Sequence, residues 1–293
     1  KKSRSPVVAV NYIRNKNLCF DKRQDCFAKY GKPLGMLWNT RYGSVATIRK
    51  GQLMFSLSES AVVWTKGVLS QKISLQEQLL LQMSDRYSSS EKMRMGGYIK
   101  RMEYFRRNIL RTDGRRIEDV ASRLRGLEGM ASKLYFECMN HLLPSDLRFK
   151  ERSQHPARDT VNAMLNYGYG IMYGVIHVEL IKSGIDPFVG ILHKDNYNKP
   201  VLVYDVIELY RTWIDEVIFT IAIKDGTDAD TWCSVSDGAC WLEDAGRPKV
   251  TLSVNEFLAE VITLDGKSRS RRSHIALYCQ RLAKSFKKEY DTE

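Results

Sequence analysis

The stretch "KISLQEQLLLQMSD", residues 72–85, marks the point where the hydrophobic pattern of this chain changes. After it, apolar residues recur mainly at intervals of three and four, the spacing that places them on one face of a helix. The exceptions are a charged loop at residues 149–159 and an extended insertion at residues 225–250, which the strand-like "TLSV" follows. Before residue 70 the apolar runs are short and rich in β-branched and aromatic residues, as in "SVATIRK", "QLMFSLS" and "AVVWTK". The sequence therefore predicts an α+β protein with a small N-terminal antiparallel β domain in residues 1–68, followed by a larger all-α domain in residues 69–293.

The charge balance points to a polyanionic partner. Lys and Arg number 46 against 34 Asp and Glu, which gives a net charge of +12. Such an excess favours binding to nucleic acid through phosphate neutralisation and counterion release, without specifying which polymer is bound. Two stretches, residues 98–125 and 266–288, place clustered Arg and Lys beside apolar positions at helical spacing. The alternative is that both stretches are ordinary solvated helix faces.

The cysteines and the apolar stretches bear on the cellular compartment. Six cysteines include no CxxC pair and are too sparse for a small secreted disulfide scaffold, so we expect a protein of the reducing cytoplasm. The longest uncharged stretch, residues 160–178, contains asparagines and tyrosines, which favours a buried helix over a membrane span. The chain begins without Met or an apolar signal core, which suggests a fragment, a processed chain or a module of a longer protein.

Glu128 is the first candidate for chemistry. Apolar residues of the surrounding segment, "SRLRGLEGMASKLYFEC", fall on one helical face, and Glu128 falls on that same face. A carboxylate in that position is costly unless something pairs with it. Glycines near it would let another backbone or a ligand approach closely. The alternative is a structural ion pair with Arg125 or Arg158.

Two further acids, Asp205 and Glu208, would also be costly on an apolar helical face without a partner. If residues 201–219 are largely helical, Asp205 and Glu208 lie one turn apart on one face. Arg211 on that face could neutralise them, and a divalent metal is the alternative. His193 precedes Asp205 by 12 residues; an isolated histidine is more often structural than a ligand. Acids from two helices together with one imidazole would suit Mg²⁺ or Mn²⁺.

Three longer blocks resemble one known family. They are "LRGLEGMASKLYF" (124–136), "PARDTVNAMLNYGYGIMYG" (156–174) and "GIDPFVGILHKDNYNKPVLVYDVIELYR" (184–211). In order and spacing they are similar to the signature blocks of the CRISPR-associated integrase family, called Cas one, which inserts new spacers into CRISPR arrays. Residues 1–68 look like the β domain of this family but are short for it, so its first strands are expected to be missing. Some relatives are fused to a reverse transcriptase, which would suit a chain start without Met.

The resemblance implies roles for individual residues. Glu128, His193 and Asp205 match the residues that bind a divalent metal, Mg or Mn, and Glu208 matches an additional acid beside them. The residues expected to contact nucleic acid, by resemblance or as candidates for phosphate contacts and base stacking, are Arg125, Arg152, Arg158, Asn162, Tyr167 and Tyr173. Tyr169 is expected to pack in the core instead.

The resemblance also implies an activity. It predicts a metal-dependent DNA integrase of CRISPR adaptation that joins 3′-hydroxyl ends of spacer DNA to repeat phosphodiesters by transesterification, with endonuclease and disintegration as side reactions. The expected partners are DNA, a second copy of the chain in a homodimer, and a small ferredoxin-like protein, the second Cas protein. Two alternatives stay open: a related transposase or stand-alone metal nuclease, and a non-catalytic nucleic-acid-binding scaffold whose acids pair with arginines.

Overall fold

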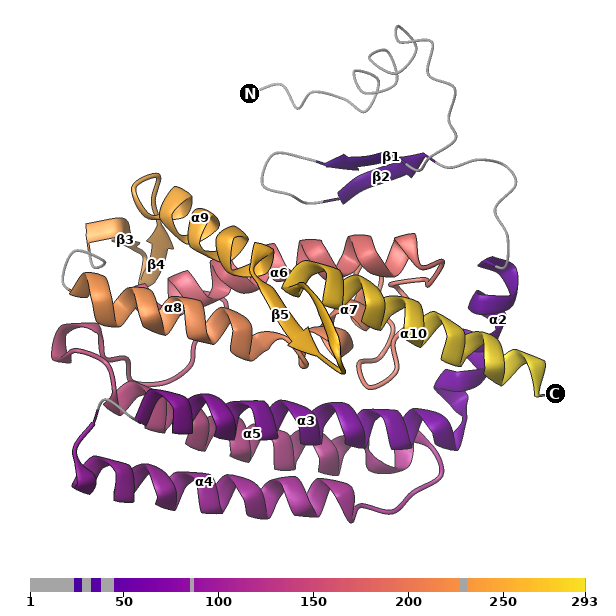
Figure 1. Cartoon of the computed structure of the whole chain (residues 1–293), viewed down its shortest axis with the longest axis horizontal. Helices are drawn as coiled ribbons and strands as arrows, with labels where there is room; N and C mark the ends of the chain where they lie inside the picture. Colours follow the sequence, from indigo (N-terminus) through magenta and orange to yellow (C-terminus); the bar gives the residue numbers. More distant parts are fainter. Residues whose placement is uncertain (1–23, 28–32, 38–44, 85–86, 227–230, 293) are drawn as a thin grey trace, which may run out of the picture.

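The computed structural model describes residues 24–27, 33–37, 45–84, 87–226 and 231–292, and most of these residues are helical (Figure 1). The helices are α2 (Val45–Leu57), α3 (Glu59–Ser84), α4 (Ser89–Leu110), α5 (Ile117–His141), η1 (Ser145–Leu147), α6 (Thr160–Lys182), α7 (Val201–Ile207), α8 (Arg211–Asp225), α9 (Gly246–Ala259) and α10 (Arg271–Asp291). The strands are β1 (Gln24–Phe27), β2 (Pro33–Leu37), β3 (Cys233–Ser236), β4 (Ala239–Leu242), β5 (Val261–Leu264) and β6 (Lys267–Ser270). They form antiparallel pairs, β1 with β2, β3 with β4 and β5 with β6. The last two pairs lie within residues 69–293, so the prediction that this region is all α is wrong in this detail, although the region is mostly helical.

The strands predicted for residues 45–66 are wrong, because these residues form α2 and the first part of α3. In α2 the buried residues Ile48, Gln52 and Phe55 recur at helical intervals. The β-branched and aromatic content of these runs is only a weak preference, which packing of a helical face overrides. The predicted boundary at residue 68 falls within α3, and most of the rest of the predicted β domain lies outside the described residues.

Helices α2 and α10 come from the two ends of the helical region and pack side by side (Figure 1). Their backbones approach closely at Gly51, where a Cβ atom would lie 1.9 Å from the Phe286 backbone oxygen. One turn later Phe55 meets the edge of the Phe286 ring, with 5.1 Å between ring centroids. Glycine at position 51 therefore allows α10 to close against α2.

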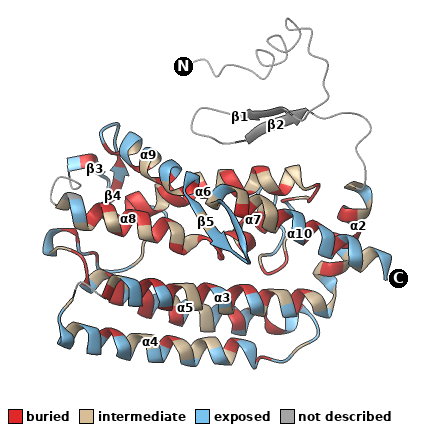
Figure 2. Cartoon of the chain, in the orientation of Figure 1, coloured by how far each residue is buried: buried red, intermediate tan, exposed pale blue. Residues whose placement is uncertain are grey.

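The remaining helices form two layers. Helices α3, α4 and α5 lie alongside one another, and α4 turns Met95, Met102 and Ile109 inward while its outer side is exposed (Figures 1 and 2). Helix α6 lies in the second layer and contacts α7, α8, α9 and α10. Its first two turns bury nearly every residue, which confirms the buried helix predicted from residues 160–178. Within the described residues, no helix is both long and apolar enough for a membrane crossing.

Candidate functional site

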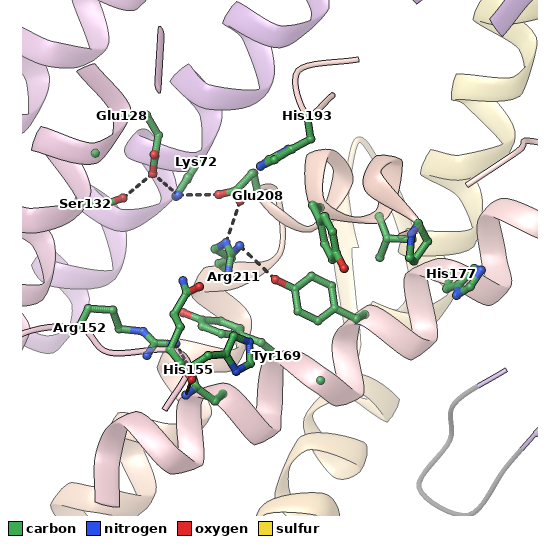
Figure 3. A pocket seen from close by; sticks show the side chains of 18 of the residues that line it. Lys72, Glu128, Ser132, Arg152, His155, Tyr169, His177, His193, Glu208 and Arg211 are labelled. Atoms are coloured by element: carbon green, nitrogen blue, oxygen red, sulfur yellow. Dashed lines mark hydrogen bonds and ion pairs between the residues drawn. The ribbon is translucent and has the colours of Figure 1, made fainter. Parts of the chain in front are cut away.

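A cleft with a volume of about 1100 Å³ opens between the two layers and is lined by residues of α3, α5 and α6 and of the segments around α7 (Figure 3). Three of the four predicted catalytic residues, Glu128, His193 and Glu208, line this cleft. Glu128 comes from α5, whereas His193 lies in the loop between α6 and α7 and Glu208 directly follows α7. The fold therefore brings together acids that lie 80 residues apart in sequence.

The carboxylates of Glu128 and Glu208 are joined by Lys72 of α3 (Figure 3). The Lys72 ammonium donates a hydrogen bond to Glu128 Oε1, and its Nζ lies 2.5 Å from Glu208 Oε2. Lys72 is only 5% exposed. Burial by itself would lower the pKa of Lys72, but the two carboxylates outweigh it, and the pKa lies above its ordinary value. The cleft thus contains a charged ammonium group between its two acids.

Glu208 has a second cationic partner in Arg211. The predicted helix over residues 201–219 is interrupted, because α7 ends at Ile207 and α8 begins at Arg211. Across this turn Arg211 Nε donates to Glu208 Oε1 at 2.9 Å, which is one of the two pairings that the sequence left open for these acids. Burial tends to raise the pKa of Glu208, but Arg211 and Lys72 together lower it to about 2. Glu208 is therefore ionised throughout the neutral pH range.

Asp205 lies behind the cleft and does not line it. It is 2% exposed and accepts hydrogen bonds from the backbone N–H groups of Ile191, Leu192 and His193 at 2.8, 3.2 and 3.1 Å. Its Oδ1 also lies 2.6 Å from His193 Nδ1. This bond is the main cause that raises the pKa of His193. Asp205 thus fixes the loop and the imidazole, an arrangement typical of the carboxylate behind a metal-binding histidine.

The position of Asp205 leaves Nε2 of His193 directed into the cleft. The His193 side chain is 39% exposed, and Figure 3 shows its ring pointing toward Glu208. Within residues 45–84, 87–226 and 231–292, no three His, Cys, Asp or Glu side chains are grouped closely enough to form a metal site as they stand. The space between Glu128 and Glu208 holds the Lys72 ammonium instead.

Residues 25–256 match the family model described as CRISPR associated protein Cas1. The chain belongs to the Cas1 family. A curated relative from Thermus thermophilus, "CRISPR-associated endonuclease Cas1 1", is 33% identical over 141 residues, which cover 48% of this chain and 44% of the relative. The chain therefore spans less than half the length of that curated Cas1 relative.

Solved structures agree on the Cas1 fold. The structure "Casposase bound to integration product" superposes with a TM-score of 0.74 at 19% identity and covers 96% of this chain and 79% of its own. A "Partial Cas6-RT-Cas1–Cas2 complex" gives a TM-score of 0.74 at 21% identity and covers 90% of this chain and 77% of its own. At these identities the similarity concerns the fold alone.

In this Cas1 chain, two of the six residues predicted to contact nucleic acid line the cleft. Arg152 donates to Asn162 Oδ1 at 2.7 Å and to Asn166 Oδ1 at 2.6 Å, which fixes its guanidinium at the cleft wall. The Tyr173 hydroxyl accepts a hydrogen bond from Arg211 at 3.3 Å. Both side chains are available to a ligand that enters the cleft.

The other four residues predicted to contact nucleic acid do not line the cleft. Arg125 is exposed on α5 and donates to the Leu192 oxygen at 3.3 Å, so it lies beside the loop of His193. Arg158 is exposed and pairs with Glu151 at 3.3 Å. The Tyr167 hydroxyl bonds to Thr251 at 3.1 Å.

Asn162 is 0% exposed and is held by hydrogen bonds to the loop before α6. Its amide donates to the Glu151 oxygen at 3.0 Å and to Asp159 Oδ2 at 2.6 Å. Its Oδ1 accepts from Arg152 and from the Ser153 backbone N–H. Asn162 therefore anchors the loop before α6 and holds Arg152 in place.

Lys72 is a residue of the site that was not predicted from the sequence. Its signal was of the same kind as that of Glu128, because Lys72 follows Leu69 by three residues on the buried face of α3. Ser132 was not predicted either; it lies one turn after Glu128 and donates to its Oε1 at 2.6 Å. The proposed pairing of Glu128 with an arginine is replaced by pairing with this lysine.

Asp215 lies beneath the cleft in a buried polar cluster. It is 0% exposed and accepts hydrogen bonds from the hydroxyls of Tyr135, at 3.0 Å, and Tyr169. The Tyr169 ring, which is buried as expected, lies under the guanidinium groups of Arg152 and Arg211 at 5.4 and 4.8 Å from its centroid. Burial raises the pKa of Asp215 to about 6 despite these partners.

We expect the free energy of unfolding of the wild type to fall with rising pH because of Asp215, and that of Asp215→Asn to lack this dependence. The folded protein holds the Asp215 proton up to about pH 6, whereas the unfolded chain releases it near 3.8. The free energy of unfolding therefore falls as pH rises through this window, by about 3 kcal/mol at about 1.4 kcal/mol per pKa unit. Urea unfolding of both proteins across this window measures the difference. The control is Asp244→Asn, because the Asp244 side chain is 96% exposed. Parallel curves of unfolding free energy against pH for the wild type and Asp215→Asn would refute the prediction.

Proposed function

We propose that this protein is a metal-dependent DNA integrase of CRISPR adaptation, which joins 3′-hydroxyl ends of spacer DNA to phosphodiesters of the repeat. The observation that carries the proposal is the convergence of Glu128, His193 and Glu208 on one cleft in a basic chain of the Cas1 family. The name of the curated endonuclease relative and the fold shared with a casposase bound to an integration product support it.

The residues of the cleft fit a Mg²⁺ or Mn²⁺ ion. Glu208 Oε2 is buried, and its partner is a cation, the Lys72 ammonium 2.5 Å away. The cleft thus attracts a cation, and carboxylates with one imidazole suit these metals. Glu128, His193 and Glu208 would hold the ion, and Asp205, which the sequence assigned to the metal, would orient His193. Such an ion, when bound, would stabilise charge on the reacting phosphate and activate the attacking hydroxyl.

The reaction we propose is a direct transesterification. The 3′ oxygen of the spacer forms a bond to a repeat phosphorus, the bond from that phosphorus to the repeat 3′ oxygen breaks, and the attacking hydroxyl's proton ends on the leaving oxygen. The number of phosphodiester bonds is unchanged, so neither a nucleotide cofactor nor a covalent enzyme intermediate is needed. Arg152 would bind a phosphate, and Tyr173 would pack against the DNA end. Attack by water gives endonuclease activity, and the reverse reaction gives disintegration.

The proposal includes partners. The net charge of +12 favours binding of both the spacer precursor and the repeat DNA. We propose that the chain acts in the cytoplasm as a homodimer together with a small ferredoxin-like second Cas protein. The similar fold of a chain in the "Partial Cas6-RT-Cas1–Cas2 complex" supports this assembly. A related transposase is the second candidate, because a casposase shares the fold with a TM-score of 0.74.

A strand-joining assay tests the proposal. A short labelled duplex with 3′-hydroxyl ends is incubated with the protein, a supercoiled plasmid carrying a CRISPR repeat, and Mn²⁺, with and without the second Cas protein. We expect label joined to relaxed plasmid, and no joining when the ends are 3′-dideoxy or when EDTA replaces Mn²⁺. Joining without preference for the repeat would favour the transposase. Cleavage without joining would favour a nuclease, and duplex binding alone would favour the non-catalytic scaffold.

A further inference from the structure

The cation that now joins the two acids of the cleft belongs to the chain itself. Lys72 comes from α3, and it contacts Glu128 from α5 on one side and Glu208 from the other helical layer on the opposite side. We propose that Lys72 is an internal cation that occupies the space between these carboxylates in the metal-free protein and is displaced when a divalent metal binds there. This inference rests on the proposed metal dependence.

The ammonium and a metal ion would require the same oxygens. Lys72 bonds to Glu128 Oε1 and lies 2.5 Å from Glu208 Oε2, whereas the other Glu208 oxygen accepts from Arg211 at 2.9 Å. Glu208 therefore has one oxygen left for a cation in the cleft. Mg²⁺ binds oxygen ligands at about 2.0–2.1 Å, and repulsion between like charges would expel an ammonium from direct contact with it.

The structure also supplies a position for the displaced ammonium. Gln76 lies one turn after Lys72 on α3, and both side chains line the cleft. Gln76 is 1% exposed, yet its Oε1 has no hydrogen-bond partner in the described part of the chain. Residues four apart on a helix are neighbours, and the flexible stem of lysine allows its ammonium to reach such an acceptor. We assign Gln76 Oε1 as the partner of Lys72 in the metal-bound protein.

This exchange of cations has two linked consequences. In the metal-free protein Lys72 stabilises the fold, because it neutralises Glu128 and Glu208, which would otherwise repel each other. Metal binding must replace that stabilisation, so Lys72 lowers the affinity for the metal. Removal of the lysine should therefore destabilise the metal-free protein and at the same time tighten metal binding.

Lys72→Met tests the inference with Mn²⁺ alone as the probe. Calorimetric titration of the full chain is expected to show Mn²⁺ binding at least about tenfold tighter than in the wild type. The melting temperature in EDTA is expected to fall, and its rise on adding Mn²⁺ to exceed that of the wild type. The matched control is Lys133→Met, which removes an exposed lysine from the same cleft and is expected to change the affinity much less.

Several outcomes would overturn the inference. If Lys72→Met binds Mn²⁺ no more tightly than the wild type, the inference is overturned while the proposed function stands. If Lys133→Met gains as much Mn²⁺ affinity as Lys72→Met, the gain is a general charge effect and the inference is also overturned. If neither wild type nor Lys72→Met binds Mn²⁺, the inference fails together with the proposed metal dependence. Lys72→Gln, which keeps a hydrogen-bond donor without charge, replaces the methionine variant if that variant does not fold, and the same tightening is expected.

The role of Gln76 is tested separately. Gln76→Leu removes the acceptor for the displaced ammonium, so Mn²⁺ binding is expected to weaken several-fold when Lys72 is present. In the Lys72→Met background the same change is expected to have no effect, because no ammonium needs the acceptor. Equal effects in both backgrounds would overturn the assigned position of the displaced lysine.

Discussion

Glu128→Gln is expected to reduce strand joining by about a thousandfold or more while duplex binding changes by no more than a few-fold. Glutamine has nearly the same volume and can still accept a hydrogen bond from Ser132, which lies 2.6 Å from Glu128 Oε1. It cannot supply the negative charge that pairs with Lys72 or would hold a divalent cation. Since phosphoryl transfer depends mainly on positioning and charge stabilisation, chemistry should be lost and binding retained.

The measurement is the strand-joining assay in Mn²⁺ beside a duplex-binding titration at fixed salt. Glu137→Gln is the matched control, because Glu137 is an exposed acid on the same helix. It should join strands at the wild-type rate. Joining by Glu128→Gln within about tenfold of that rate would mean that Glu128 only pairs with Lys72 and has no part in the reaction.

Asp205→Ala is expected to lower the free energy of unfolding by several kcal/mol, on the order of 4. The substitution removes the acceptor of three backbone N–H groups and of the His193 imidazole, all in a buried or half-buried place. Each buried donor left without a partner costs about 1–3 kcal/mol. Strand joining should also be lost, because His193 would no longer be held toward the cleft.

Urea unfolding measures this loss. The control is Asp195→Ala in the same loop, since Asp195 is exposed and accepts one hydrogen bond, from Gly190 N–H at 2.8 Å. Its loss should be below about 1 kcal/mol. If Asp205→Ala were no less stable than Asp195→Ala, the loop would not depend on Asp205, and the sequence-based assignment of Asp205 as a direct metal ligand would regain support.

Part of the site could be predicted because a carboxylate on an apolar helical face is energetically costly without a partner, and the sequence shows where such residues fall. Glu128 was found since a carboxylate on an apolar helical face must have a partner, and the pairing of Glu208 with Arg211 follows from their spacing of three. The same reasoning did not identify the partner of Glu128, because Lys72 lies 56 residues earlier and only the packing of α3 on α5 brings the two together.

Other predictions depended on weak local preferences. Residues 45–66 contain the β-branched and aromatic residues typical of strands, yet they form α2 and part of α3. Intrinsic propensity amounts to less than about 1 kcal/mol per residue, so the burial of a helical face decides between the two structures. The contact of Asn162 with DNA was expected from the family resemblance and stays a prediction, and the loop before α6 leaves this residue fully buried.

The mostly helical character after residue 72, the excess positive charge, and the family blocks that contain Glu128, His193 and Asp205 can all be inferred from the sequence alone. Which acid faces the cleft depends on the packing of distant segments and could not be inferred from the sequence. Asp205 and Glu208 lie one turn apart, but the break after α7 turns Glu208 toward Lys72 and Arg211 and leaves Asp205 with the backbone of the His193 loop. Residue spacing fixes neighbours along a helix, whereas the direction of a buried charge is set by partners from distant segments.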